Sequence, residues 1–278
     1  MILGLSAVCL LVIACEVVFG LSLGDFSSNM MSWSAKTSSM AQLVSYLKAS
    51  EAITDQAVAD VMLKVDRALF CDKGRQTEIS GGPYVDHPLP LECGQTISAP
   101  HIHAMSLEVL QSPAMTHGAR ILDVGSGSGY VSACFAVMNP SAKVFGIDVY
   151  EDLVNSSIRK VATLPGGAPP NLSLQCADGW GGLIKEGPFH AINVGAAGVS
   201  IPARLANSLA VGGRMLIPVG PMRGPQRMLV VSRISGIPAK VVGGEHLSSM
   251  SERMDPNEFS IKEAHSVAFV PLIKTKSY

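Results

Sequence analysis

Three apolar runs in the middle of the chain each end in an aspartate. They read Ile121-Leu-Asp123, Val144-Phe-Gly-Ile-Asp148 and Leu172-Ser-Leu-Gln-Cys-Ala-Asp178. Short apolar runs bounded by turn residues are typical of buried strands, and a helical spacing of apolar residues begins at Tyr130, between the first run and the second. Strands that alternate with helices predict an α/β fold with a doubly wound, mostly parallel sheet.

Two further patterns extend this fold toward its ends. Apolar residues with helical spacing follow Thr54-Asp55 and predict a helical layer ahead of the sheet: Val58, Val61, Met62, Val65 and Leu69. The runs 214–219 and 228–233 predict an antiparallel hairpin among the last strands.

The first run leads into a glycine-rich loop, Gly125-Ser-Gly-Ser-Gly129. Such loops let a nucleotide approach the backbone closely. A dinucleotide fingerprint would place its third glycine at position 130, which is Tyr, and Asp123 would repel a pyrophosphate. The loop therefore favours S-adenosylmethionine, whose amino acid end suits an acid. A dinucleotide site and a purely structural turn stay open as alternatives.

The aspartates at the three strand ends are expected to line one crevice, because ligands of doubly wound sheets lie beyond the carboxyl ends of the strands. Asp148 lies 25 residues after Asp123, a spacing suited to hydrogen bonding with a ribose diol. Asp178, with the Gly179 amide beside it, is the candidate partner of the adenine amino group. Each aspartate taken alone could instead cap a helix or a turn.

Four segments together resemble the protein-L-isoaspartate (D-aspartate) O-methyltransferase family. The most specific is Gly94-Gln-Thr-Ile-Ser-Ala-Pro-His-Ile-His-Ala104, and the others are 122–129, 194–197 and 212–220. The resemblance runs from about Met31 to about Lys274, with 267–272 similar to that family's last strand. It implies a class I S-adenosylmethionine-dependent methyltransferase fold with a seven-stranded sheet.

The resemblance also implies a reaction: methylation of the α-carboxyl of isoaspartyl residues in damaged proteins, with S-adenosyl-L-methionine as cofactor, which initiates repair. A carboxylate has a pKa near 4 and needs no general base at neutral pH, so the protein's task is to position the reacting groups. Ser98 matches the family's active-site serine and could orient a carboxylate oxygen. The residues alone, without the resemblance, favour a helix cap at Ser98, ahead of the apolar pattern that follows Pro100.

The remaining cofactor contacts come from the family match and the glycine loop. His103 matches a histidine that approaches the cofactor, Gln95 and Thr96 accompany it, and Ser128 and Gln226 match other contacting positions. The full set of expected cofactor-binding residues is Gln95, Thr96, His103, Asp123, Gly125, Gly127, Ser128, Asp148, Asp178, Gly179 and Gln226. No metal site is expected, because His101 and His103 do not share a helix face.

The chain departs from the family where Phe189-His190-Ala-Ile-Asn193 stands in place of Tyr-Asp-Ala-Ile-His. These changes motivate an alternative function, a protein of the same fold that binds S-adenosylmethionine without transferring its methyl group. A dinucleotide-dependent oxidoreductase is a third reading, which Tyr130 weakens.

The net charge bears on which kinds of molecule the protein is expected to bind. The net charge of −1 lacks the basic excess of a nucleic-acid binder, so nucleic acid is not an expected partner. The resemblance implies isoaspartyl peptides and proteins as the partners, and the enzyme is expected to be a monomer. Residues 31–278 are expected to form one methyltransferase domain. Residues 1–30 are an apolar leader, either a targeting segment or an incorrectly assigned start.

The cysteines and the apolar N-terminal stretch bear on the cellular compartment. Cys134 and Cys176 fall in apolar elements where buried free thiols are common, which indicates a reducing, cytoplasmic setting. The alternative is a secreted or membrane-anchored protein held through residues 1–24, a nearly uninterrupted apolar stretch.

Overall fold

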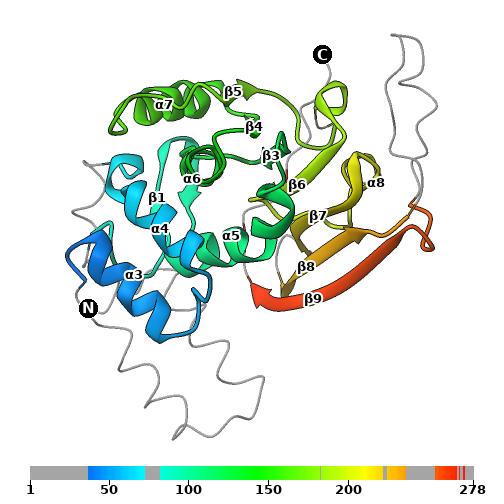
Figure 1. The fold of residues 1–278 in the computed structure, drawn as a ribbon, viewed down its shortest axis with the longest axis horizontal. Coiled ribbons are helices and arrows are strands. Elements are labelled where there is room, and N and C mark those ends of the chain that lie inside the picture. The colour runs from blue at the N-terminus through cyan, green and yellow to red at the C-terminus, as the bar shows by residue number, and fades with distance from the viewer. Residues whose placement is uncertain are drawn as a thin grey trace, which may run out of the picture. The chain divides into compact units, whose positions relative to one another are not determined.

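A seven-stranded sheet forms the centre of the molecule, with strand order β5-β4-β3-β6-β7-β8-β9 (Figure 1). The computed structural model describes residues 37–72, 82–181, 183–221, 224–235 and 254–267, together with 269 and 272. The strands are β3 (Arg120–Val124), β4 (Lys143–Asp148), β5 (Leu172–Cys176), β6 (Phe189–Val194), β7 (Leu209–Val219), β8 (Gln226–Arg233) and β9 (Phe259–Val267). Strands β3 to β7 run parallel, whereas β8 runs antiparallel to both of its neighbours. The predicted α/β class, mostly parallel sheet and hairpin are confirmed.

Alternation along the strands divides the core between the two faces of the sheet. Ile121 on β3 packs into one cluster, with the residues of the N-terminal helices, while its neighbour Leu122 packs into the other. The same division separates Ala191 from Ile192 on β6. Successive side chains of a strand point to opposite faces, so both faces of a central strand must be apolar when both are covered.

In the described part of the chain, five helices lie beside the first cluster and one lies beside the second. The five are α3 (Met40–Ala49), α4 (Gln56–Lys64), α5 (Pro100–Ala114), α6 (Tyr130–Met138) and α7 (Glu151–Ala162), and the sixth is α8 (Ala203–Asn207). Asp55 begins α4 as its N-cap, with a side-chain oxygen that accepts from the Ala57 amide at 2.7 Å. Helix α7 has acids in its first turn and bases in its last, which suits the helix dipole.

One sequence expectation for the elements is wrong in detail. The helical pattern predicted through Leu69 breaks after Lys64 and resumes as a separate 3₁₀ helix, Arg67–Phe70. The last described strand is β9 at Phe259–Val267, which pairs with β8 at the edge of the sheet. In the segment 267–272, which resembles the family's last strand, residues 268, 270 and 271 lie outside the described part of the chain. An edge strand has fewer buried positions than a central one, so its apolar pattern is weak.

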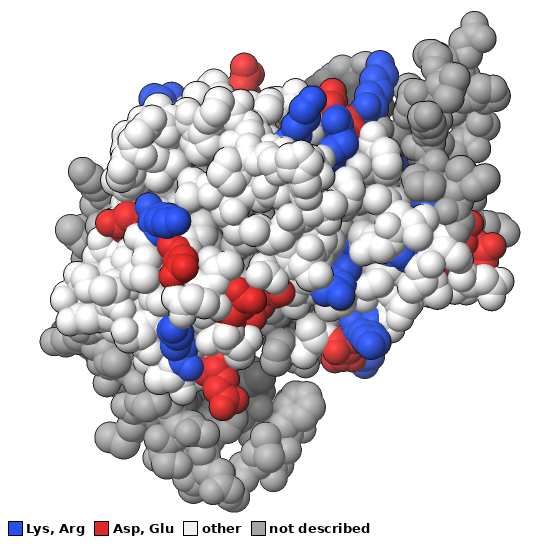
Figure 2. All heavy atoms as spheres, in the orientation of Figure 1, with Lys and Arg blue, Asp and Glu red and all other residues white. Residues whose placement is uncertain are grey.

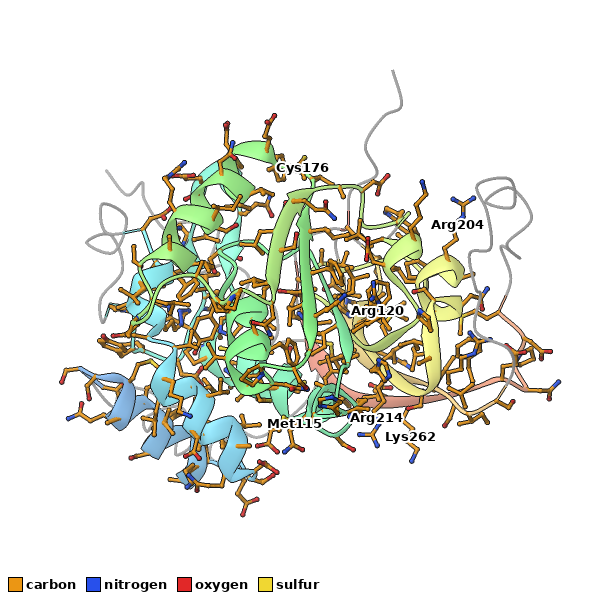
Figure 3. The ribbon with its side chains drawn as sticks, turned by 45° about the horizontal axis from the view of Figure 1, so that its top comes forward. Met115, Arg120, Cys176, Arg204, Arg214 and Lys262 are labelled. Carbon is orange, nitrogen blue, oxygen red and sulfur yellow. The ribbon has the colours of Figure 1, made fainter. Side chains whose placement is uncertain are left out.

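The loop after β3 lies where the strand order reverses, since β4 follows on one side of β3 and β6 flanks the other. Ligands of open α/β sheets bind at such a switch point. Figure 3 shows Cys176 and Lys262, from the two edge strands, on opposite sides of the molecule. On the face shown in Figure 2, basic and acidic side chains lie interspersed.

The sequence analysis predicted an N-terminal apolar leader and two buried free thiols. None of the helices among the described residues is long and apolar enough to cross a bilayer, and the expected leader, residues 1–30, lies outside the described part of the chain.

Cys134 is buried and free, as expected, but Cys176 is exposed. Its strand lies at the sheet edge, where pairing covers one side only.

Candidate active site

The glycine loop turns sharply between β3 and α6. Gly125 and Gly127 have φ angles of 71° and 53°, in the left-handed region that side chains disfavour. The Gly125 amide donates to the Ile147 carbonyl at 2.8 Å, which ties the loop to the end of β4. The loop backbone therefore forms a fixed, open surface at the edge of the sheet.

Asp148, at the end of β4, braces this loop. One carboxylate oxygen accepts from the Gly127 amide at 3.0 Å, and the other accepts from the Tyr150 amide at 3.2 Å. Burial raises the pKa of Asp148, and the backbone hydrogen bonds oppose that rise. Each oxygen keeps a free lone pair, so the carboxylate can still accept from a ligand hydroxyl.

Asp123, at the end of β3, is held by two side-chain donors. Ser132 donates to one carboxylate oxygen at 2.6 Å, and Asn193 donates to the other at 2.8 Å. The side chain is almost wholly buried, and this burial raises its pKa, against the effect of the two hydrogen bonds. Asn193, one of the two departures from the family pattern, thus contacts a predicted site residue directly.

Two adjoining pockets open at this edge of the sheet. The first, the Asp148 pocket, is lined by residues that include Gln95, Thr96, Gly127, Asp148, Gly179 and Ala196. The second, the Ser98 pocket, is lined by residues that include Ser98, His103, Asp123, Ser128, Tyr130 and Asn193. Thr96, Gly125, Gly127 and Gly195 line both. The two pockets therefore meet over the glycine loop and can hold two parts of one ligand, or two ligands side by side.

Three buried polar atoms on the wall of the Ser98 pocket have no hydrogen-bond partner: His103 Nδ1, Ser126 Oγ and the Tyr130 hydroxyl. The His103 and Tyr130 rings lie 4.7 Å apart. Burial lowers the pKa of His103 well below its ordinary value, with the charges of Arg67 and His101 as smaller causes. The imidazole is therefore neutral at neutral pH. Buried polar groups are normally paired, so these atoms indicate a polar ligand.

Ser98 lies between β2 (Thr96–Ile97) and α5. The N-cap of α5 is Ala99, and no side chain caps this helix. The Ser98 hydroxyl makes no hydrogen bond with any residue in the described part of the chain, whereas its main-chain oxygen accepts from Arg67 at 2.8 Å. The helix-cap interpretation of Ser98 is therefore wrong, and the hydroxyl is free to contact a ligand.

Two expected cofactor residues lie in neither of these pockets. Asp178 accepts from the Trp180 amide at 2.8 Å, as a turn aspartate does, although its neighbours Ala177 and Gly179 line the Asp148 pocket. Gln226 is buried at the start of β8, where its amide hydrogen-bonds to the Phe269 N–H at 2.6 Å and to the Phe269 carbonyl at 3.2 Å. Gln226 thus positions Phe269, which itself lines the Ser98 pocket.

The sequence-derived set omitted Asn193, Ser126 and Gly195, which line the pockets. Asn193 and Gly195 stand at the end of β6, beside β3 in the sheet. The rule that placed the three aspartates at the carboxyl ends of strands would also have indicated these positions. His190, at the opposite end of β6, accepts from the Arg120 amide at 3.1 Å and takes no part in either pocket.

Comparison with known proteins relates this site to one family. The family model described as protein-L-isoaspartate(D-aspartate) O-methyltransferase matches residues 38–243. A Triticum aestivum protein-L-isoaspartate O-methyltransferase is 43% identical over 182 residues, which are 64% of this chain and 76% of the relative. A Caenorhabditis elegans protein of the same name is 35% identical over 239 residues, 82% of this chain and 100% of the relative.

A solved structure agrees with the sequence relatives. It is a Plasmodium falciparum protein-L-isoaspartate O-methyltransferase in complex with S-adenosyl-L-homocysteine, with a TM-score of 0.67 and 29% identity. The similarity covers 86% of this chain and 100% of that one.

Proposed function

This chain belongs to the protein-L-isoaspartate(D-aspartate) O-methyltransferase family, and we propose that its Ser98 pocket receives the substrate carboxylate beside S-adenosylmethionine held over the glycine loop. The protein is an enzyme that uses S-adenosylmethionine to methylate isoaspartyl residues in damaged proteins. The observation that carries the assignment of Ser98 is its hydroxyl, which lines the Ser98 pocket and has no hydrogen-bond partner among the described residues.

The residues of the site fit the cofactor. S-adenosylmethionine combines an adenosine with a positively charged sulfonium and an amino acid end. Asp148 offers acceptors for a ribose diol, and Asp123 offers a buried negative charge for a cationic group. Gly179 lines the Asp148 pocket, and an added Cβ there would lie 2.5 Å from the Val124 side chain, so the packing accepts only glycine at this position. We propose Gln95, Thr96, His103, Ser128, Gly125 and Gly127 as the other contacts, with Asp178 and Gln226 acting indirectly.

The proposed mechanism requires no proton transfer by a side chain of the protein. The cofactor supplies an activated methyl group, and the substrate carboxylate is already ionised at neutral pH. Ser98 donates a hydrogen bond to one carboxylate oxygen and leaves the other to attack. The loop backbone and Thr96 hold the two reactants next to each other, which lowers the entropic part of the barrier. His103 stays neutral and transfers no proton.

The replacement of His by Asn at position 193 is compatible with this mechanism. The Asn193 amide still donates to Asp123, so the acid keeps both of its donors. An amide does not titrate, and the hold on Asp123 is therefore independent of pH.

The experiment that tests this function measures methyl transfer to an isoaspartyl peptide beside its normal aspartyl isomer. The wild-type enzyme should methylate only the first. Ser98→Ala should lower turnover by about ten- to a thousandfold while cofactor affinity and thermal stability stay unchanged, because an orienting donor acts mainly in the reacting complex. The wild-type rate should stay nearly flat from about pH 6 to 8.

Ser50→Ala is a matched control, since Ser50 ends α3 on the outer surface and should not alter turnover. Equal methylation of both peptides would contradict the proposed substrate. Normal turnover in Ser98→Ala would remove Ser98 from the mechanism, and a methylated serine trapped on the enzyme would replace direct transfer by a two-step route.

We further propose the following for partners and location. The enzyme acts as a monomer on peptides and proteins in the cytoplasm, and not on nucleic acid; the net charge of −1 and the interspersed surface charges of Figure 2 support this. Residues 31–278 form the methyltransferase domain, while 1–30 form a separate leader that contacts a membrane only where it is retained as an anchor. The family match, which begins at residue 38, supports that boundary.

A further inference from the structure

Arg67 is fully buried, and no acid among the described residues forms an ion pair with it. It lies in the 3₁₀ helix Arg67–Phe70, with an exposed fraction of 0%. Its Nη2 donates to the main-chain oxygens of Ser98 at 2.8 Å and His87 at 3.2 Å, its Nη1 donates to Cys71 Sγ at 3.6 Å, and its Nε has no partner. No carboxylate oxygen within the described ranges lies within 4.0 Å of this guanidinium. Main-chain dipoles solvate the charge without neutralising it.

A second buried arginine shows the usual arrangement. Arg233 on β8 has an exposed fraction of 3%, and its Nη2 lies 3.0 Å from the Glu258 carboxylate. An arginine is charged at all physiological pH values, and burial of a charge is costly unless it is paired. Within the described ranges an ion pair neutralises Arg233, whereas none neutralises Arg67.

The Arg67 charge lies against the wall of the Ser98 pocket. Ser98, whose carbonyl it contacts, lines that pocket, as do His103 and Tyr130. After burial, the positive charge of Arg67 is the next cause that lowers the pKa of His103. It also opposes the rise in the pKa of Tyr130 that burial and Cys134 produce. Two wall residues on different helices therefore feel this charge.

The pocket itself offers an anion no other positive charge. No Lys or Arg is among its described lining residues, and His103 is neutral. The acid in its wall, Asp123, suits a cation and repels a carboxylate. Asp123 hydrogen-bonds to Ser132 and Asn193, and Arg67 to Ser98 and His87, so the two charges belong to separate networks.

We propose that the buried positive charge of Arg67 selects a carboxylate ligand in the Ser98 pocket, and that its hydrogen bond to the Ser98 main chain holds that serine in place. Arg67 does not touch the substrate and is a positioning residue. The inference rests on the proposed function, because it requires the substrate carboxylate to enter this pocket.

The charge should act on substrate binding more than on the chemical step. In the reaction a carboxylate oxygen forms a bond to the methyl carbon while the carbon–sulfur bond breaks, and its electron pair stays on sulfur. The carboxylate and the sulfonium both lose their charge as this happens. A fixed positive charge therefore stabilises the bound carboxylate more than the reacting complex, and its loss should raise KM more than it lowers kcat.

The experiment measures the dissociation constants of two peptides with S-adenosyl-L-homocysteine at saturation. One is an isoaspartyl peptide, and the other carries an α-carboxamide in place of its free α-carboxyl group. The wild-type enzyme should bind the carboxylate at least about tenfold more tightly, the effect of one charge several ångströms away in a partly buried site. Arg67→Met should reduce this ratio to within about threefold, whereas Arg67→Lys, which keeps the charge, should retain most of it.

Arg233→Met is the matched control, since it removes a buried arginine far along the chain and should leave the ratio unchanged. A general loss of stability cannot produce the expected result, because the ratio compares two ligands on the same variant. An unchanged ratio in folded Arg67→Met overturns the inference and leaves the proposed function intact. Failure of the wild-type enzyme to bind or methylate the isoaspartyl peptide overturns the proposed function itself.

If Arg67→Met does not fold, a measurement on the wild-type enzyme decides. The α-carboxyl carbon of the peptide is labelled with carbon-13 and titrated in the bound state by NMR. A pKa below that of the free peptide supports the inference, and a bound pKa equal to or above the free value overturns it.

Discussion

At the scale of single residues, the site depends on groups whose ordinary properties are altered by burial. Asp148 and Asp123 end neighbouring strands, yet their surroundings differ. Asp148 accepts hydrogen bonds from the backbone amides of Gly127 and Tyr150 and lines the Asp148 pocket. Asp123 accepts hydrogen bonds from the side chains of Ser132 and Asn193 and lines the Ser98 pocket. Two acids from one sequence pattern are thus suited to two different parts of a ligand.

Removal of the Asp148 carboxylate should weaken cofactor binding. We expect Asp148→Ala to reduce the affinity for S-adenosylmethionine by about 1.5–3 kcal/mol, the range for a hydrogen bond to a charged group. Calorimetric titration measures this change directly, and Asp60→Ala, an exposed position on α4, serves as the control. Unchanged affinity in a folded Asp148 variant, or tighter binding of a nicotinamide dinucleotide by the parent, would contradict the assignment.

The buried, neutral His103 should make stability depend on pH. Its pKa is lowered on folding, chiefly by burial, so below about pH 6.5 the unfolded chain binds a proton that the folded chain does not. Its contribution to stability is therefore complete above about pH 6.5 and is lost as the pH falls. Burial lowers the pKa of His190 too, which adds a slope of the same sign.

Urea denaturation at several pH values between 5 and 7.5 tests this linkage. The free energy of unfolding of His103→Gln should fall less steeply toward pH 5 than that of the wild type. His117→Gln, at an exposed position after α5, provides the comparison. A slope in His103→Gln as steep as in the wild type would show that His103 is already accessible to protons in the folded state.

At the scale of elements, short connections carry the functional groups while strands and helices hold them. Ser98 lies between β2 and α5, and the glycine loop lies between β3 and α6. Arg67 and Gln226 act from behind these connections: the first bonds to the Ser98 main chain and the second to the main chain of Phe269. A buried side chain that satisfies main-chain groups fixes a loop without regular secondary structure.

Gln226 should therefore matter more for stability than for direct cofactor binding. Gln226→Ala leaves the N–H and the carbonyl of Phe269 without this partner, so we expect a loss of about 1–3 kcal/mol in the free energy of unfolding. Affinity for S-adenosylmethionine should change by less than about threefold. Denaturation and calorimetric titration on the same variant separate the two roles. A large loss of affinity at unchanged stability would instead place Gln226 in contact with the cofactor.

At the scale of the whole molecule, the reversal of strand order beside β3 collects the site. The carboxyl ends of β3, β4 and β6 meet there, and the Ser98 segment and Phe269 cover the same edge from distant parts of the chain. Asp123 and Arg67 belong to separate hydrogen-bond networks beside one pocket, an arrangement suited to a cationic cofactor and an anionic substrate.

The proposed domain boundary gives a prediction at this scale. A chain that begins at Met31 keeps Thr37, whose hydroxyl donates to the Tyr84 carbonyl, and Ser39, the N-cap of α3. We expect it to retain the melting temperature and methyl-transfer rate of the full chain, both measured side by side. A melting temperature lower by more than about 4 °C would show that residues 1–30 stabilise the fold, since such a shift corresponds to roughly 1–2 kcal/mol for a domain of this size.

Local sequence patterns alone predicted several elements of the fold and the family. Apolar runs ending in acids predicted β3 and β4, the left-handed glycines followed from the loop composition, and the segment around Ser98 indicated the family. These features depend on residues that are neighbours along the chain, and the same physical preferences act on them before and after folding.

Tertiary structure alone decided which side chains meet. Asn193 and Asp123 are 70 residues apart, and Gln226 and Phe269 are 43 apart, so no local pattern announces either contact. The exposure of Cys176 depends on which strand lies at a sheet edge. Arg67 looks in the sequence like any basic residue that ends a helix. The structure buries it against the Ser98 main chain with no ion pair to a described acid, and the proposed role of its charge rests on that placement.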